Sequence, residues 1–290
     1  MSLSPEQVEQ FKQDGYLVIE DHLSTQDCDV LRERAFQIIK EADMSQHPMT
    51  TFSTVDKDKG AQTRTDYFVT SGDKIRFFFE EGALGENGKL TMPPIEAVNK
   101  IGHALHIFEP EFKKVTFSDK IKGIARSLGV VKPSVPQSMV IFKQPKIGGR
   151  VNPHQDSSFL HTTPMNLVGF WIALEDAEPD NACMWFAPGT HKSGISGRLL
   201  RTEEDGKLGT KFEGTSPSTD ENKFVCAPVR KGSLVLIHGE VVHKSPPNLS
   251  ERSRNIYTFH LYDGTSEWSK DNWQQPTEEV PFPFLYEKTE

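Results

Sequence analysis

The chain has 290 residues, of which 36% are hydrophobic, so it is long enough to bury one large core. Its formal net charge of −8 argues against a nucleic-acid or anionic-membrane surface, because phosphate groups are bound by clustered Lys and Arg. We therefore expect one domain over residues 1–290 that acts on a small molecule.

The cysteines and the two ends of the chain indicate the compartment. Cys28, Cys183 and Cys226 are widely spaced and form no C-x-x-C pair, so we expect reduced, buried thiols rather than disulfides or a zinc site. The N-terminal residues carry charges among their apolar positions, unlike a secretion signal, and no window approaches a membrane span of roughly 20 apolar residues. The last three residues, Lys-Thr-Glu, are not a Ser-Lys-Leu peroxisomal tail. We expect a cytoplasmic monomer.

The first 130 residues are predicted to be mainly helical. A helix should begin after the N-cap Ser4, which Pro5 follows, and should end at Gly15. Further along we expect a strand at 16–19, a helix from 24–27 onward, a polar loop at 44–60, a strand at 66–69, and helices at 95–107 and 118–128.

After residue 130 the pattern changes to short β-rich runs separated by Pro and Gly. The expected strands are 139–142, 168–174, 184–186, 223–226, 233–237 and 255–261. Since no βαβ alternation is present, these runs predict an antiparallel barrel or jelly roll over about 131–265, packed against the helices of about 1–130. Residues 189–222, rich in Gly, Ser and Thr, are expected to be an inserted loop.

The motif His154-Gln155-Asp156 is the central chemical feature of the sequence. In an extended strand residues i and i+2 point to the same side, so the imidazole and the carboxylate could bind one metal ion. Because H-x-D by itself is common, the motif needs a third ligand and a cosubstrate anchor. His243, which follows the apolar strand 233–237, would complete a two-His, one-carboxylate set that leaves three positions open on Fe(II). Arg254 could then bind the distal carboxylate of a keto acid in a bidentate pair.

Several segments together resemble the phytanoyl-CoA dioxygenase family. They are His154-Gln155-Asp156, the turn Pro-Gly-Thr-His-Lys-Ser-Gly at 188–194, and His243 with Ser245 and Arg254. The similarity runs from Phe-Lys-Gln-Asp-Gly-Tyr at 11–16 almost to the C-terminus. The resemblance implies a mainly β fold with flanking helices, namely a double-stranded β-helix, or cupin-like jelly roll, with N-terminal helices packed on the major sheet.

The resemblance also implies cofactors and site residues. Fe(II) would be held by the catalytic residues His154, Asp156 and His243, with 2-oxoglutarate as cosubstrate and O2 as oxidant. The cosubstrate pocket would be formed by Lys100, Met139, Trp171, Ser245 and Arg254, the last two binding the far carboxylate. From the residues alone, Trp171 could equally be a core residue, and Lys100 would be read as a lysine on a solvated helix face.

Other histidines compete for these roles. His238 ends the strand before His243 and is an alternative third ligand; we favour His243 because its spacing to Ser245 and Arg254 fits the family. We expect structural roles for His161, His191 and His260.

The expected reaction is oxidative decarboxylation of 2-oxoglutarate to succinate and CO2, coupled to hydroxylation of a small molecule, for instance a lipid or acyl compound. Asp156 favours hydroxylation over halogenation, since the family's halogenases lack the carboxylate ligand and bind chloride in its place. The alternative is a catalytically silent, cupin-like protein that binds metal and 2-oxoglutarate as a sensor. If the substrate were an acyl-CoA, the candidate partners of its phosphates would be Lys113, Lys114, Lys143, Lys146 and Arg150. A nucleophilic hydrolase is not indicated, because no G-x-S-x-G elbow is present.

Overall fold

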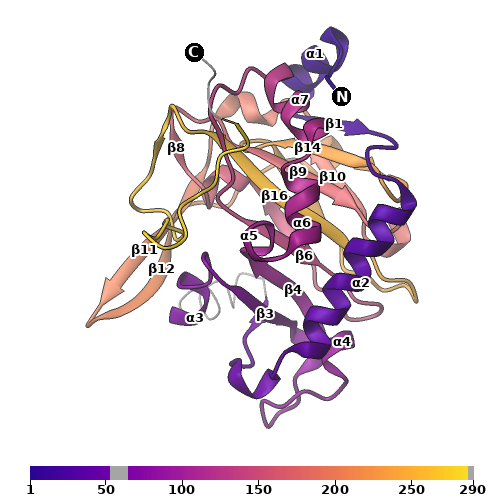
Figure 1. Cartoon of the computed structure of the whole chain (residues 1–290), viewed down its shortest axis with the longest axis vertical. Coiled ribbons are helices and arrows are strands. Elements are labelled where there is room, and N and C mark those ends of the chain that lie inside the picture. Colours follow the sequence, from indigo (N-terminus) through magenta and orange to yellow (C-terminus); the bar gives the residue numbers. More distant parts are fainter. Residues whose placement is uncertain (53–64, 287–290) are drawn as a thin grey trace.

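The computed structural model describes residues 1–52 and 65–286, and within these ranges two β-sheets form the framework (Figure 1). The major sheet has the strand order β1-β14-β9-β16-β6-β4-β3-β2, with β5 paired to β16, and the minor sheet has the order β13-β10-β15-β7. All pairings in both sheets are antiparallel except that of β2 with β3. The expected jelly roll, mainly β with flanking helices, is confirmed.

The strands are short, as the Pro- and Gly-rich sequence predicts. The major sheet contains β1 (Tyr16–Ile19), β2 (Thr51–Phe52), β3 (Ile75–Glu80), β4 (Val98–His103), β5 (Pro133–Ser134), β6 (Ser138–Ile141), β9 (Val168–Ala173), β14 (Leu234–His238) and β16 (Ile256–Asp263). The minor sheet contains β7 (Val151–His154), β10 (Met184–Ala187), β13 (Val225–Ala227) and β15 (Val242–Ser245). Two further pairs are β11 (Gly197–Glu204) with β12 (Lys207–Gly214), and β8 (Thr162–Thr163) with β17 (Glu267–Trp268).

Helices cover one face of the major sheet. They are α1 (Pro5–Asp14), α2 (Thr25–Glu41), α4 (Pro94–Ala97), α5 (Leu105–Phe108), α6 (Pro110–Thr116) and α7 (Asp119–Ser127), which all contribute to the core on that face. The short helix α3 (Asp66–Val69) belongs to a separate apolar cluster through Phe68 and Val69. The 3-10 helices are Met44–Gln46, Glu81–Ala83, Asp156–Ser158, Pro179–Asn181, Thr190–Ser193 and Glu221–Lys223. In Figure 1, α2, α6 and α7 lie over β9 and β16, and Leu31, Phe112 and Ile124 share one apolar core with Phe170 and Phe259 of those strands.

The alternation of side chains along β9 divides the core in two. Phe170 and Ile172 belong to the core beneath the helices, whereas Trp171 and Ala173 belong to a second core with Phe186 of the minor sheet. This is the period of two expected when both faces of a strand are covered. Side chains such as that of Trp171 therefore point into the space between the two sheets and pack toward the minor sheet.

Most predicted elements are confirmed to within a few residues. The Ser4 side chain accepts a hydrogen bond from the Gln7 amide, and Gly15 ends α1 with φ of 82°, a left-handed conformation that glycine adopts without strain. α2, α7 and the six predicted strands after residue 130 form where expected. No helix in the described ranges is both long enough and apolar enough to cross a membrane.

Three element predictions are wrong. Residues 66–69 form α3 rather than a strand, with Thr65 capping the Phe68 amide. The segment 95–107 is helical only at its ends, because its centre is the fully buried strand β4, paired with β3 and β6. The expected loop 189–222 contains the hairpin β11–β12. In these cases partners distant in sequence override local propensity.

Three remaining expectations are met in part. Of the polar loop 44–60, the described residues form a 3-10 turn and β2, and residues 53–60 lie outside the described ranges. The part before residue 131 is not only helical, since it supplies β1 to β4 to the major sheet. Cys28 and Cys183 are buried thiols as expected, whereas Cys226 is half-buried, with its Sγ 3.2 Å from that of Cys183. The single domain over 1–290 stays a prediction.

Candidate metal centre and cosubstrate pocket

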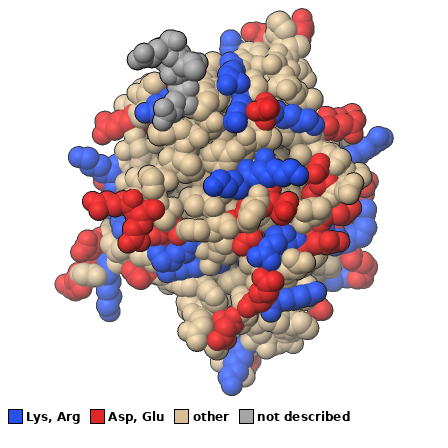
Figure 2. All heavy atoms as spheres, viewed as in Figure 1, with Lys and Arg blue, Asp and Glu red and all other residues tan. Residues whose placement is uncertain are grey.

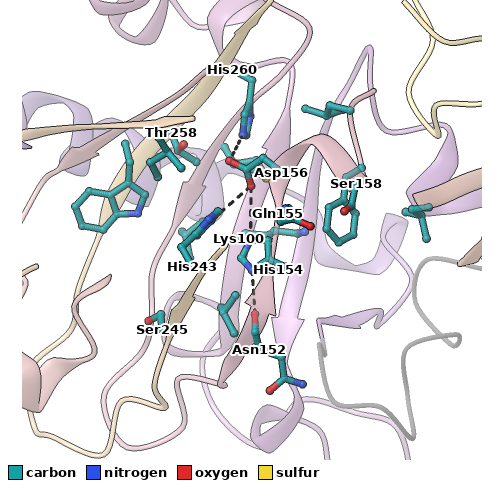
Figure 3. Close-up of a pocket in the computed structure, with 18 of the residues that line it drawn as sticks. Lys100, Asn152, His154, Gln155, Asp156, Ser158, His243, Ser245, Thr258 and His260 are labelled. Carbon is teal, nitrogen blue, oxygen red and sulfur yellow. Dashed lines mark hydrogen bonds and ion pairs between the residues drawn. The ribbon is translucent and has the colours of Figure 1, made fainter. Parts of the chain in front are cut away.

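His154, Asp156 and His243 converge at one point between the two sheets (Figure 3). His154 ends β7 and pairs with His243 of β15 across the minor sheet. Gln155 is extended, so it carries the chain to Asp156, which begins a 3-10 turn, with His154 and Asp156 on the same side. One ligand atom from each of the three residues lies within 4.8 Å of the others. The geometry predicted for the H-x-D motif and its distant partner is present.

Hydrogen bonds from the backbone fix the orientation of both imidazoles. Nδ1 of His154 lies 2.9 Å from the Asn152 carbonyl oxygen, and Nδ1 of His243 lies 3.0 Å from that of Val241. A carbonyl oxygen only accepts, so each Nδ1–H donates and each Nε2 keeps a free lone pair. Both Nε2 atoms lie 3.6 Å from Asp156 Oδ1. Two imidazoles and a carboxylate are a suitable donor set for a divalent cation.

Burial and neighbouring groups set the protonation states. Burial is the main cause that lowers the pKa of His243 to about 4, assisted by the neighbouring His154, so its imidazole is neutral at pH 7. Burial by itself would raise the pKa of Asp156, but its three imidazole neighbours outweigh this effect and hold that pKa well below the usual value. The centre therefore offers an anionic oxygen from Asp156 and an uncharged nitrogen from His243.

A cavity of about 260 Å³ adjoins this centre and brings together all eight predicted site residues. Its lining includes His154, Asp156 and His243, together with Lys100, Met139, Trp171, Ser245 and Arg254. Arg254 is 2% exposed, its Nη1 donates to the Ala182 carbonyl oxygen at 3.0 Å, and its guanidinium lies 5.3 Å from the Trp171 ring. Ser245 Oγ donates to the same carbonyl oxygen at 2.9 Å. Burial lowers the pKa of Arg254 to about 10, which leaves it charged at pH 7.

Lys100 is not on a solvated helix face. It lies on β4 and is 5% exposed, with its ammonium 4.9 Å from the Phe78 ring and 5.7 Å from the Phe68 ring. Burial lowers its pKa to about 7. Met139 on the neighbouring β6 lies beside it, since Lys100 pairs with Ile141 and Gly102 pairs with Met139.

Part of the cavity wall is apolar. It consists of side chains from α3, the hairpin β11–β12, the segment that follows Asp156 and the C-terminal part of the chain, namely Phe68, Phe159, Leu160, Leu199, Phe212 and Trp273. The Phe159 ring lies 6.1 Å from that of His154, so this wall borders the metal centre. The predicted loop is therefore a hairpin that contributes to the cavity.

The remaining histidines divide into two groups. His191 Nε2 donates to the Lys12 carbonyl oxygen at 3.0 Å, and the ring of His238 packs 4.7 Å from that of His191, outside the metal-ligating group. His161 does not line the cavity. These positions fit structural roles. In contrast, Nε2 of His260 lies 3.1 Å from Oδ2 of Asp156.

The structural role expected for His260 stays a prediction, although its imidazole lines the cavity and contacts a candidate ligand. The sequence did carry a signal for it, because residues 254, 258 and 260 share one parity, and in a strand such residues face the same side. With Arg254 assigned to the cavity, the same face of β16 presents Thr258 and His260 to it.

Lys143, suggested as a partner of CoA phosphates, is not available at the surface. It is 1% exposed and donates to the Gly149 carbonyl oxygen. Lys146 is exposed and pairs with Glu251 at 2.6 Å. On the face shown in Figure 2, Lys and Arg are interspersed with Asp and Glu among the described residues.

Comparison with known proteins gives the family. A protein-family model described as phytanoyl-CoA dioxygenase (PhyH) matches residues 11–256 of the sequence. The chain is 53% identical over 287 residues to phytanoyl-CoA dioxygenase domain-containing protein 1 of Bos taurus, covering 98% of this chain and 99% of the relative. It is 44% identical over 275 residues to phytanoyl-CoA dioxygenase of Arabidopsis thaliana, covering 94% of each.

Solved structures share the fold at low identity. The non-heme alpha ketoglutarate dependent carbocyclase SnoK from nogalamycin biosynthesis aligns with a TM-score of 0.62 at 18% identity, covering 96% of each chain. EctD from S. alaskensis, solved with 2-oxoglutarate and 5-hydroxyectoine, aligns with a TM-score of 0.62 at 17% identity, covering 98% of this chain and 83% of that one. These structures show the fold, and the family model together with the sequence relatives shows that the chain belongs to the phytanoyl-CoA dioxygenase family.

Proposed function

We propose that this protein is an Fe(II)- and 2-oxoglutarate-dependent dioxygenase that hydroxylates a small-molecule substrate. The observation that carries the proposal is the presence of His154, Asp156 and His243 on the wall of a cavity that also contains the buried cation Arg254. The donor set suits Fe(II), and the cation suits a dicarboxylate.

The ligand set fits iron by its chemistry and by its orientation. His154 and His243 each present Nε2 because Nδ1 is bound to a backbone carbonyl, and Asp156 presents Oδ1 to both. His154, Asp156 and His243 would hold the ion through three ligands only, so the keto acid and dioxygen could also reach it. Bound iron would supply the chemistry that couples loss of CO2 from 2-oxoglutarate to oxidation of a C–H bond.

Arg254 and Ser245 would bind the far carboxylate of 2-oxoglutarate. Among the described residues Arg254 Nε is buried without a hydrogen-bond partner, so the guanidinium has donor capacity left for an anion. Ser245 Oγ shares the Ala182 carbonyl with Arg254 and can reorient toward the ligand. Trp171 supports the guanidinium from one side.

The apolar wall would hold the substrate and exclude water from the reacting atoms. Phe159, Leu199 and Phe212 give this side of the cavity few groups that could bind a charge. The reacting part of the substrate is therefore expected to be a hydrocarbon segment.

The alternative function is that of a catalytically silent protein that binds metal and 2-oxoglutarate as a sensor. The same ligand set and the same Arg254 would serve it, so only turnover separates the two. The cytoplasmic location and the monomeric state stay predictions in either case.

The test is succinate production from 2-oxoglutarate with Fe(II) in air, with and without candidate substrates. We expect iron-dependent succinate release that is lost in His154→Ala and in Arg254→Ala. Arg252→Ala is the matched control, because Arg252 is exposed and pairs only with Glu178 and Asp180 at the surface. Tight binding of Mn(II) and 2-oxoglutarate with no succinate from any substrate panel would favour the sensor.

A further inference from the structure

The two oxygens of the Asp156 carboxylate face different neighbours. Oδ1 lies 3.6 Å from Nε2 of His154 and 3.6 Å from Nε2 of His243. Oδ2 lies 3.1 Å from Nε2 of His260. In Figure 3, His260 is on the opposite side of the carboxylate from both ligand imidazoles. Only Oδ1 is therefore turned toward the candidate metal position.

Gln137 determines which nitrogen of His260 carries the proton. The Gln137 side-chain amide nitrogen lies 3.2 Å from His260 Nδ1, and the His260 backbone N–H donates to the Gln137 carbonyl oxygen. An amide NH₂ only donates, so Nδ1 accepts and the proton resides on Nε2. That N–H is the one that faces Asp156 Oδ2, and a carboxylate oxygen only accepts. The three groups form a consistent hydrogen-bonded chain in which Gln137 and His260 are buried and the accepting Asp156 side chain is 14% exposed.

A glycine leaves the space in which this contact forms. Gly169 on β9 pairs directly with His260 on β16. A Cβ at position 169 would lie 3.2 Å from Asp156 Oδ2 and 3.6 Å from His260 Cδ2, and 3.3 Å from Ile237 Cβ. Gly169 stands in an otherwise apolar, fully buried strand, where a glycine weakens packing unless another group approaches closely. Here the approaching group is the carboxylate that His260 holds.

We propose that His260 is a positioning residue that keeps Asp156 a one-oxygen ligand. This inference rests on the proposed iron- and 2-oxoglutarate-dependent function. An octahedral ion with three protein ligands has three open positions, and 2-oxoglutarate fills two of them. If both oxygens of Asp156 bound the ion, the second oxygen would occupy the last position and dioxygen could not bind there. By holding Oδ2, His260 keeps that position open and fixes the direction of Oδ1.

His260 contacts the candidate ligand Asp156, and in this it differs from His106, another buried histidine. His106 is equally buried, and its Nδ1 bonds to Ser138 without facing the cavity. Among the described residues, the metal-ligating group contains His154, Asp156 and His243 but not His260. His260 thus contacts a ligand rather than the metal, and His106 is a matched control for loss of a buried imidazole.

The experiment measures Co(II) affinity by calorimetry and the Co(II) ligand-field spectrum, so it needs no substrate. We expect His260→Leu to bind Co(II) about 10- to 100-fold more weakly, the usual effect of losing a group that orients a ligand. Its spectrum should change because Oδ2 becomes free to bind. His260→Gln should recover most of the affinity and the wild-type spectrum, since its side-chain amide can donate to Oδ2. His106→Leu should lower thermal stability and leave both Co(II) readouts unchanged.

The outcomes separate this inference from the proposed function. Wild-type affinity and spectrum in His260→Leu, or equal losses in the Leu and Gln variants, would overturn the positioning role. If His260→Leu does not fold, Gln137→Leu is the second variant, because it keeps the imidazole of His260 but removes the donor that fixes its tautomer. We expect Gln137→Leu to bind Co(II) more weakly than the wild type, with a smaller loss than that expected for His260→Leu. Wild-type Co(II) affinity in Gln137→Leu would contradict the inference. His154→Ala tests the metal centre itself: if it binds Co(II) as the wild type does, the proposed function fails, whatever His260 does.

Discussion

Replacing Arg254 by Met removes a buried positive charge and keeps a long side chain that can pack against Trp171. Because the pKa of Arg254 falls from 12.5 to about 10, and one pKa unit corresponds to about 1.36 kcal/mol, burying this cation costs the fold about 3 kcal/mol. At pH 7.5, below both values, Arg254 is charged in the folded and unfolded chains, so the full cost applies; it would diminish only as the pH rises above about 10.

The contacts of Arg254 offset this cost in the free protein. Its hydrogen bond to the Ala182 carbonyl contributes about 1.5–3 kcal/mol as a charged hydrogen bond, and its contact with Trp171 adds about 0.5–2 kcal/mol. The cost of burying the Arg254 charge and the stabilisation from its two contacts nearly cancel. We therefore expect Arg254→Met to change the unfolding free energy of the protein without 2-oxoglutarate by no more than about 1–2 kcal/mol.

Binding of 2-oxoglutarate should respond very differently. Loss of the charged partner of its far carboxylate is expected to cost about 3–5 kcal/mol, which is a loss of affinity of more than 100-fold. The assay is thermal unfolding in the presence of Mn(II), with and without 2-oxoglutarate. At 100 times the wild-type Kd the ligand adds about 2.7 kcal/mol, so for a chain of 290 residues the wild-type Tm should rise by about 4 °C and that of the variant by less than about 1 °C.

Arg252→Met is the control, since it removes an exposed arginine and should leave the ligand-induced rise intact. The reasoning would be refuted if Arg254→Met kept a wild-type rise in Tm with 2-oxoglutarate. It would also be refuted if the variant without ligand lost well over 3 kcal/mol of stability, because Arg254 would then be a structural residue.

Two further predictions follow from buried groups at the same cavity. Burial lowers the pKa of Lys100 from 10.5 to about 7, so its charge destabilises the fold fully below pH 7 and less as the pH rises toward 10.5. The substitution Lys100→Met should therefore increase the unfolding free energy by roughly 3 kcal/mol more at pH 6 than at pH 9.5. An equal increase in urea unfolding at the two pH values would contradict this. In Gly169→Ala the new Cβ would lie 3.2 Å from Asp156 Oδ2, so Co(II) affinity measured by calorimetry should fall by about 10-fold; unchanged affinity would show that the carboxylate has room to move.

Local features of the sequence were sufficient where the structure depends on neighbours in the chain. The Ser4 cap with Pro5, the glycine end of the first helix and the apolar strand at 168–174 appear as predicted. The H-x-D motif is of the same kind, because an extended chain places residues i and i+2 on one side wherever the motif occurs. The choice of His243 and Arg254 needed more, and the resemblance to a family supplied it.

The tertiary structure alone decided the rest. Lys100 is on a strand because β4 is inserted between β3 and β6, although its sequence has helical periodicity. The hairpin β11–β12 and the contact of His260 with Asp156 likewise join segments that only the packed fold brings together. Propensity acts over a few residues, whereas burial and hydrogen bonding are satisfied by whichever segments meet in space. The sequence by itself determined the ligand types and their local direction, and the packing of the two sheets determined what surrounds them.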